Sequence, residues 1–257
     1  MKKRLVYYVA LMVAVVLTAC EERPNVSDRV IVKSVTDYFI DDEPLVMNYI
    51  SDAEGRVTSF RMMQFGEPGV EVFYRGDEVE VQVFAEDSVR KDIYEAEDGR
   101  ILRLKNDADN QSRWEYDDAG HLLKEVRQLG VGDSERLSVT ILEWSGDVPV
   151  KMNCQEIIDG EVSQEYGFEF EYYDGKPVNL PTNIDLFHEM QYSSRVACLG
   201  LTGVKVGIPL KSVRHIGMDE GVVENFSYEY DEKGRITGVY DGAEDDMERV
   251  LWFEIKY

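Results

Sequence analysis

Residues 113–122 read RWEYDDAGHL and residues 227–236 read SYEYDEKGRI, so one pattern of aromatic, acidic, glycine and basic positions occurs twice. In each copy an Asp is followed by two variable residues and a Gly, at 117–120 and at 231–234. An Asp at the first position of a type I turn accepts the N–H groups of the turn, and the Gly supplies the positive φ that follows. Short β-hairpin loops favour this chemistry. With alternating aromatic residues before it, the pattern predicts a strand–turn–strand unit.

Further copies of this turn occur along the chain. They are DAEGRV (52–57), YRGDEV (74–79, a looser variant), AEDGRI (96–101), WSGDVPV (144–150) and YYDGKPV (172–178). The glycines of the first four turns, at positions 55, 76, 99 and 120, lie 21, 23 and 21 residues apart. Such internal periodicity indicates a repeated supersecondary unit, here a hairpin.

The segments between the turns alternate apolar and charged residues. Phe168 and Phe170 alternate with Glu169 and Glu171, and valines alternate with polar residues over 79–83. Glycine turns at one end require reversals at the other, which we expect near residues 87, 132, 159 and 245. The pattern predicts a mainly β fold, an antiparallel meander of about 12–14 long strands that is curled or partly closed. The glutamates exclude the uncharged outer band of a membrane-spanning barrel, so we expect this face to meet water.

Residues 181–217 interrupt the hairpin rhythm. NIDLFHEM (183–190) predicts a short helix, and VACLGLTGVKVGIPL (196–210) is apolar and rich in glycine. We expect a helix and loop insertion that covers the apolar face of the sheet, because an antiparallel sheet with one apolar face needs a cover. The alternative is a mobile element that lines a pocket for a hydrophobic ligand.

The N-terminal segment has the pattern of an export signal. Three basic residues at positions 2–4 precede an uncharged stretch over 5–17, which is shorter than the roughly 20 residues of a membrane span. LTAC at 17–20 resembles the lipobox of bacterial lipoproteins, which are cut before the cysteine and acylated on it, as with palmitate. The resemblance implies a signal peptide over 1–19 and a stable membrane anchor on Cys20.

The residues after Cys20 bear on location and domain organisation. Glu21 and Glu22 resemble the surface-export tag of Bacteroidetes lipoproteins, which implies the outer membrane and leaves the periplasmic and cell-surface sides open. Residues 20–29 are interpreted as the lipidated N-terminus and a tether, and 30–257 as a single β domain.

Charge and cysteine content limit the partners. The chain has 28 Lys and Arg against 51 Asp and Glu, a net charge of −23, so we expect no nucleic-acid partner. Besides Cys20 the chain has Cys154 and Cys198. An exported protein allows a disulfide between them, and two buried thiols fit equally well.

The sequence offers no catalytic motif. His121, His188 and His215 lack metal-ligand spacing, and signatures of serine hydrolases, zinc proteases and phosphate-binding loops are absent. NDADNQS (106–112) alternates oxygen ligands as a calcium loop does, but Ser112 stands where that loop needs glycine, which favours a polar hairpin loop. We therefore predict no catalytic residue, no cofactor and no metal, and a protein that is not an enzyme.

Taken together, the turns resemble the tyrosine–aspartate (YD) repeats of large secreted shell-forming proteins. The order of features resembles a family of Bacteroidetes lipoproteins of unknown function described as porin-like in fold. The features are the lipobox at Cys20, the turns from Gly55 to Gly175, NIDL (183–186), the glycine-rich segment 199–210 and the closing hairpin 228–235. The resemblance implies a porin-like but water-soluble architecture and brings no site residues.

Two hypotheses for function follow. The first is a non-enzymatic, lipid-anchored outer-membrane lipoprotein that binds a partner protein or a glycan, with rows of aromatic residues as the binding surface. The alternative is a periplasmic carrier or chaperone of a lipophilic ligand held under the 196–210 segment. A hydrolase has only the abundance of carboxylates in its favour.

Overall fold

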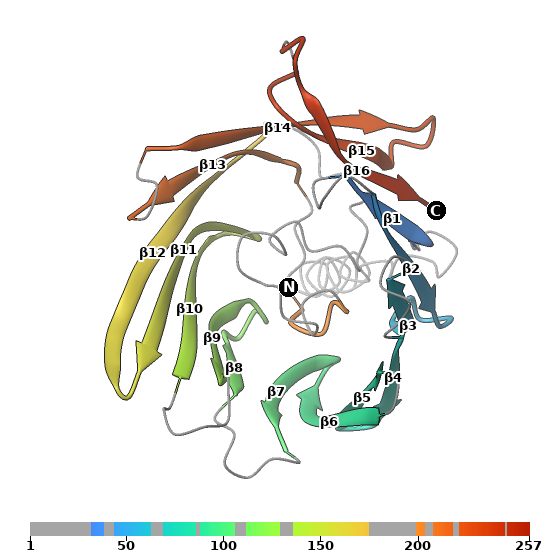
Figure 1. The fold of residues 1–257 in the computed structure, drawn as a ribbon, viewed down its shortest axis with the longest axis vertical. Coiled ribbons are helices and arrows are strands. Elements are labelled where there is room, and N and C mark those ends of the chain that lie inside the picture. Colours follow the sequence, from blue (N-terminus) through green and yellow to red (C-terminus); the bar gives the residue numbers. More distant parts are fainter. Residues whose placement is uncertain are drawn as a thin grey trace, which may run out of the picture.

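The computed structural model is a closed antiparallel β-barrel (Figure 1). It describes residues 32–38, 44–62, 69–85, 88–105, 112–128, 136–174, 199–203, 208–217, 221–244 and 246–257. The strands are β1 (Ser34–Asp37), β2 (Leu45–Ser51), β3 (Val57–Met62), β4 (Gly69–Arg75), β5 (Glu78–Ala85), β6 (Ser88–Glu97), β7 (Arg100–Leu104), β8 (Arg113–Tyr116), β9 (Leu122–Gln128), β10 (Arg136–Ser145), β11 (Val148–Ile158), β12 (Glu161–Tyr172), β13 (Leu210–Ile216), β14 (Val223–Tyr230), β15 (Ile236–Asp241) and β16 (Val250–Lys256).

Every strand pairs with its neighbours in sequence, and the first strand pairs with the last. In the closing pair, Ser34 lies opposite Lys256 and Asp37 lies opposite Phe253. The prediction of a mainly β antiparallel meander is confirmed. The prediction of about 12–14 strands in a curled or partly closed sheet is wrong, because sixteen strands form a closed barrel. Closure removes both unpaired edges of the sheet.

The predicted helix and loop insertion over 181–217 is wrong near its C-terminal end. Residues 210–216 form β13, which pairs with β12 and β14 and continues the meander. The helix predicted over 183–190 lies outside the described residues, and the described part of the chain contains no helix. One piece of the apolar segment, Leu199–Gly203, lies inside the ring of strands (orange, Figure 1). The N–H of Ile101 donates a hydrogen bond of 3.0 Å to the carbonyl of Leu201, which is 1% exposed.

The hairpin turns follow the predicted chemistry. The described turn glycines, at 55, 76, 99, 120, 146 and 234, all have positive φ. At the other end of the barrel, Asp159 also has positive φ, at 52°, and forms the predicted reversal between β11 and β12. The reversals predicted near 87, 132 and 245 lie outside the described residues.

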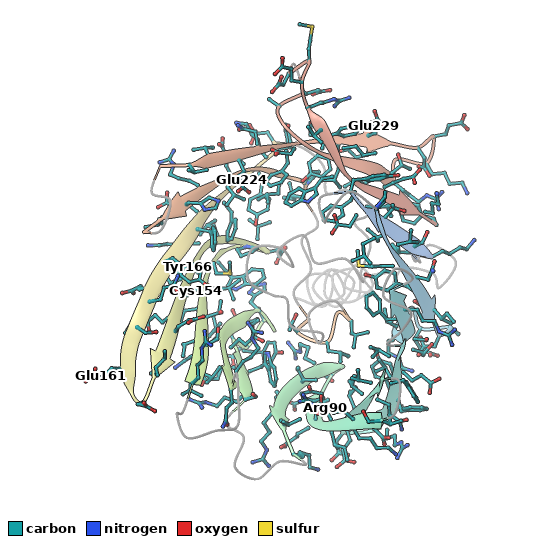
Figure 2. All side chains as sticks on the ribbon, in the orientation of Figure 1. Arg90, Cys154, Glu161, Tyr166, Glu224 and Glu229 are labelled. Carbon is teal, nitrogen blue, oxygen red and sulfur yellow. The ribbon has the colours of Figure 1, made fainter. Side chains whose placement is uncertain are left out.

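The apolar face of the sheet is the inner face of the barrel. Val79, Val81 and Val83 on β5 are buried, and they lie opposite Val72 and Val70 of β4 and Tyr94 of β6. Figure 2 shows Cys154 and Tyr166 on the inner side of β11 and β12, and Glu161 at the outer contour of the barrel. The aromatic rows predicted from the sequence thus line the interior.

Candidate functional site

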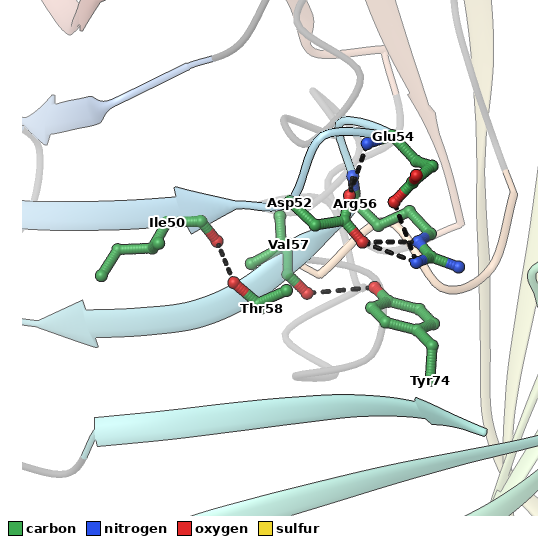
Figure 3. A network of polar contacts seen from close by, with 7 residues as sticks. All are labelled: Ile50, Asp52, Glu54, Arg56, Val57, Thr58 and Tyr74. Atoms are coloured by element: carbon green, nitrogen blue, oxygen red, sulfur yellow. Dashed lines mark hydrogen bonds and ion pairs between the residues drawn. The ribbon is translucent and has the colours of Figure 1, made fainter.

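Each complete turn motif is closed by its aspartate. In the turn after β2, Asp52 Oδ1 accepts hydrogen bonds from the N–H groups of Glu54 at 3.0 Å and Arg56 at 2.9 Å, and Oδ2 accepts one from Arg56 Nε at 2.7 Å (Figure 3). Asp231 makes the same three contacts with Lys233 and Arg235. Hydrogen bonds from the backbone and side chain of Arg235 lower the pKa of Asp231. The aspartate thus fixes the direction of the basic side chain.

The basic residue of one turn lies against the aromatic ring of the next hairpin. The pairs are Arg56 over Tyr74 at 4.4 Å, Arg100 over Tyr116 at 5.1 Å, Arg235 over Tyr257 at 4.3 Å, and His121 stacked on Trp144 at 4.4 Å between ring centroids. A guanidinium over an aromatic face is a cation–π contact. The side chain of His121 is only 20% exposed, and its Nδ1 also lies 3.0 Å from Asp117 Oδ2.

The same aromatic residues bind the backbone of the neighbouring strand. Each donates from its ring O–H or N–H to a carbonyl in the first two residues of the odd-numbered strand before it. The pairs are Tyr74 to Val57 (Figure 3), Tyr116 to Ile101, Trp144 to Leu122, Tyr172 to Pro149, Tyr228 to Leu210, and Tyr257 to Ile236. We call these six residues the aromatic collar. Burial raises the pKa of Tyr74 to about 12, so its hydroxyl remains a donor at all physiological pH. The collar fixes one end of the barrel and is a structural feature.

The outer face of the barrel carries charged pairs. They are Glu78–Lys105, Glu95–Arg103, Arg113–Glu115, Glu169–Arg214, Glu171–Lys211 and Lys256–Glu254. Exposed pairs of this kind add little stability. Their presence on strands whose other face is apolar gives the wall a charged outside and an apolar inside.

One part of the inner wall is polar. Trp114 lies opposite Glu125, Glu125 opposite Thr140, Thr140 opposite Cys154, and Cys154 opposite Tyr166, across β8 to β12. We call these five residues, which share the inner face, the interior polar patch. A register shift between Glu115 and Tyr116 changes the alternation there, so Leu122 and Glu125 of β9 both face inward.

Glu125 is the most unusual group of this patch. It is 1% exposed, Trp114 Nε1 donates to its Oε1 at 2.9 Å, and Arg127 Nε lies 3.4 Å from the same oxygen. Its second oxygen, Oε2, is buried and has no hydrogen-bond partner in the part of the chain that the structure describes. Desolvation raises the pKa of Glu125 against the opposing effects of Arg127 and Trp114.

The interior polar patch also contains a buried thiol, that of Cys154. Cys154 is 1% exposed, its Sγ lies 3.9 Å from Thr140 Oγ1, and desolvation raises its pKa to about 11. A thiol with this pKa is a weak nucleophile at neutral pH. Cys154 is a free thiol here, and its predicted disulfide partner, Cys198, lies outside the described residues, as does the predicted lipid attachment residue, Cys20.

The other residues considered from the sequence do not come together. His215 Nε2 lies 3.0 Å from Glu224 Oε1 on the inner face, far along the sheet from His121, and His188 lies outside the described residues. Most of the calcium-like stretch, 106–111, also lies outside them. In the part of the chain that the structure describes, no three His, Cys, Asp or Glu side chains are grouped to hold a metal ion. No helix of the described residues has the length and hydropathy of a membrane span.

Comparison with solved structures supports the architecture. The chain is similar to a porin-like protein from Bacteroides uniformis, with a TM-score of 0.63 and 13% identity over 89% of this chain and 99% of that one. It is also similar to a porin-like protein from Bacteroides vulgatus, with a TM-score of 0.51 and 12% identity over 88% of this chain and 98% of that one. No protein-family model and no curated protein matches the sequence. The fold is therefore porin-like.

Proposed function

We propose that this chain is a non-enzymatic, lipid-anchored outer-membrane lipoprotein whose barrel carries a lipophilic ligand. The observation that supports it is the apolar, aromatic inner face of a closed sixteen-strand barrel. A barrel of about eight strands is filled by its own side chains, whereas one of about sixteen encloses additional space. The buried apolar residues of the inner face are at most 9% exposed, so a lipophilic ligand held there would meet an apolar wall shielded from water.

The segment Leu199–Gly203 supports a partial cover supplied by the chain itself. Leu199 and Leu201 are buried inside the ring, and this segment is part of the 196–210 stretch expected to hold a ligand. The charged outer face supports a barrel that stands in water, tethered through Cys20. Binding of a glycan or partner protein by exposed aromatic rows loses its basis, because the rows line the inside.

Two measurements test the proposal. The chain and its Cys20→Ala variant are expressed in a Gram-negative host and partitioned between detergent and aqueous phases. We expect only the unsubstituted chain to enter the detergent phase and to incorporate labelled palmitate; equal partitioning would contradict the anchor.

The ligand is tested on the Cys20→Ala chain, which cannot be acylated. Native mass spectrometry after extraction from cells should show a bound species of low mass that organic solvent removes. A chain that carries no such species and takes up no added lipophile would overturn the carrier function.

A further inference from the structure

We propose that the interior polar patch binds the hydroxyl-bearing head of an uncharged amphiphile, with Glu125 Oε2 as the hydrogen-bond acceptor. This inference rests on the carrier function and specifies the class of ligand. It starts from Glu125 Oε2, a buried carboxyl oxygen that has no hydrogen-bond partner among the described residues.

A buried carboxyl oxygen without a partner is costly. Leaving one such acceptor unsatisfied costs about 1–3 kcal/mol, and more when the group is charged. The other oxygen, Oε1, is held by Trp114 at 2.9 Å, and the indole N–H is thereby satisfied. The carboxyl group is thus fixed in orientation, and Oε2 is left to accept a hydrogen bond from something outside the described wall.

The local charge selects a neutral donor. Arg127, whose Nε is 3.4 Å from Glu125 Oε1, offsets the charge of the carboxylate. An anionic head would be repelled by Glu125, and a cationic head would be repelled by Arg127. An uncharged hydroxyl group can donate a hydrogen bond to Oε2 without being repelled by Glu125 or by Arg127.

The surroundings of the patch are those of an amphiphile site. The hydroxyl-bearing residues Thr140 and Tyr166 lie on the same inner face. Thr140 is directly opposite Glu125, and Tyr166 is opposite Cys154, which in turn is opposite Thr140. Apolar residues flank the patch on both sides. Trp114 packs edge-on against Tyr94 at 5.8 Å, and Tyr166 packs against Phe168 at 6.0 Å between ring centroids. A polar head at the patch therefore leaves an acyl chain against the apolar wall.

The test compares three probes that share one acyl chain. They are 1-monomyristoylglycerol, with two hydroxyl donors, methyl myristate, with none, and myristate, which is anionic. The full chain with Cys20→Ala is stripped of bound lipophile, and binding is followed by calorimetry and by the fluorescence of its tryptophans. We expect the monoacylglycerol to bind about tenfold more tightly than the methyl ester, the effect of one such hydrogen bond.

Substitution of Glu125 makes the test specific. Glu125→Leu should abolish the preference for the monoacylglycerol and leave the affinity for the methyl ester within about twofold, because the methyl ester has no donor for the lost acceptor. Glu165→Leu, on the exposed outer face of β12, should change neither. If Glu125→Leu does not fold, Glu125→Gln serves. Trp114 would hold the amide oxygen of the new side chain. The nitrogen at the former Oε2 position cannot accept a hydrogen bond and can only donate one, to an ester carbonyl as well as to a hydroxyl oxygen, so the preference for the monoacylglycerol should shrink.

The outcomes separate the two proposals. If no probe binds the unsubstituted chain, both the carrier function and this site are refuted. If the monoacylglycerol and the methyl ester bind equally, or the preference survives Glu125→Leu, the carrier stands and the site is refuted. A crystal structure in which one ordered water stays on Oε2 with the monoacylglycerol bound elsewhere would also refute the site.

Discussion

The guanidinium carbon of Arg235 lies 4.3 Å from the centre of the Tyr257 ring, so the turn before β15 packs on the end of β16. The hydroxyl of Tyr257 donates a hydrogen bond of 2.6 Å to the carbonyl of Ile236, which is the residue after Arg235. The same relationship joins Arg56 to Tyr74. The basic residue of one motif therefore needs the aromatic residue of the next hairpin, which explains why the motif is repeated.

Removal of the Tyr257 hydroxyl tests the collar. Tyr257→Phe should lower the free energy of unfolding by about 1 kcal/mol, because the hydrogen bond to Ile236 is lost while the ring still packs under Arg235. Urea denaturation measures the change. Tyr38→Phe is the matched control, since Tyr38 is 40% exposed and its hydroxyl has no partner among the described residues. Equal effects of the two substitutions would show that the collar hydrogen bonds do not stabilise the barrel.

Gly120 tests the contact between neighbouring turns. Its φ is +89°, and a Cβ added there would overlap Nη1 of Arg100. Gly120→Ala should therefore lower the free energy of unfolding by about 2–3 kcal/mol. The loss combines the strain of a positive φ with the displacement of Arg100 from Tyr116. Gly146→Ala has the same kind of φ with nothing within 4 Å, and should cost only about 1 kcal/mol.

A double-mutant cycle separates the two parts of that cost. In an Arg100→Ala background the effect of Gly120→Ala should fall to that of Gly146→Ala, because only the strain of positive φ remains. If the cost of Gly120→Ala is unchanged in the Arg100→Ala background, then the added methyl group does not contact Arg100. Thermal or urea unfolding of the four variants is sufficient.

The turns and faces could be predicted from the sequence because they are local. An Asp and a Gly at fixed spacing determine the turn after β8, and the period of two determines which residues share a face of β12. The closure could not be predicted, because the pairing of Ser34 with Lys256 joins the two ends of the described chain. Strands of four residues, such as β1, are too short for alternation to reveal them.

The interior polar patch was missed for a different reason. Simple alternation along β9 puts Glu125 on the same side as Leu123, which is 39% exposed, and opposite Leu122. The register shift beside Tyr116 adds one residue and turns Glu125 inward. Only the pairing of β8 with β9 contains that information, so no signal within β9 itself could have found the site.

The turn aspartates predict part of the response to acid. Hydrogen bonds from the backbone of His121 and of Arg235 lower the pKa values of Asp117 and Asp231 below the ordinary 3.8. A carboxyl group whose pKa is lowered by folding stabilises the fold above its ordinary pKa, and this contribution is lost as the pH falls through the lowered value. Replacing both with Asn should destabilise the chain at pH 7 and have a much smaller effect near pH 3. Urea midpoints at pH 7, 5 and 3 measure this, with Glu232→Gln, an exposed carboxylate of the same turn, as the control. A difference that does not change with pH would contradict it.

Glu125 predicts a pH dependence of the opposite sign. Desolvation raises its pKa in the folded chain, so its contribution to stability is most favourable below the ordinary value of 4.5 and is lost as the pH rises through the raised value. Glu125→Gln keeps an oxygen for Trp114 and removes the buried charge. The variant should therefore gain stability relative to the unsubstituted chain at pH 8 and gain less at pH 4. Denaturation of both chains without added lipophile, at several values of pH, measures the difference. A gain that is larger at pH 4 than at pH 8 would mean that Arg127 compensates the carboxylate more than burial penalises it, which would contradict a raised pKa of Glu125.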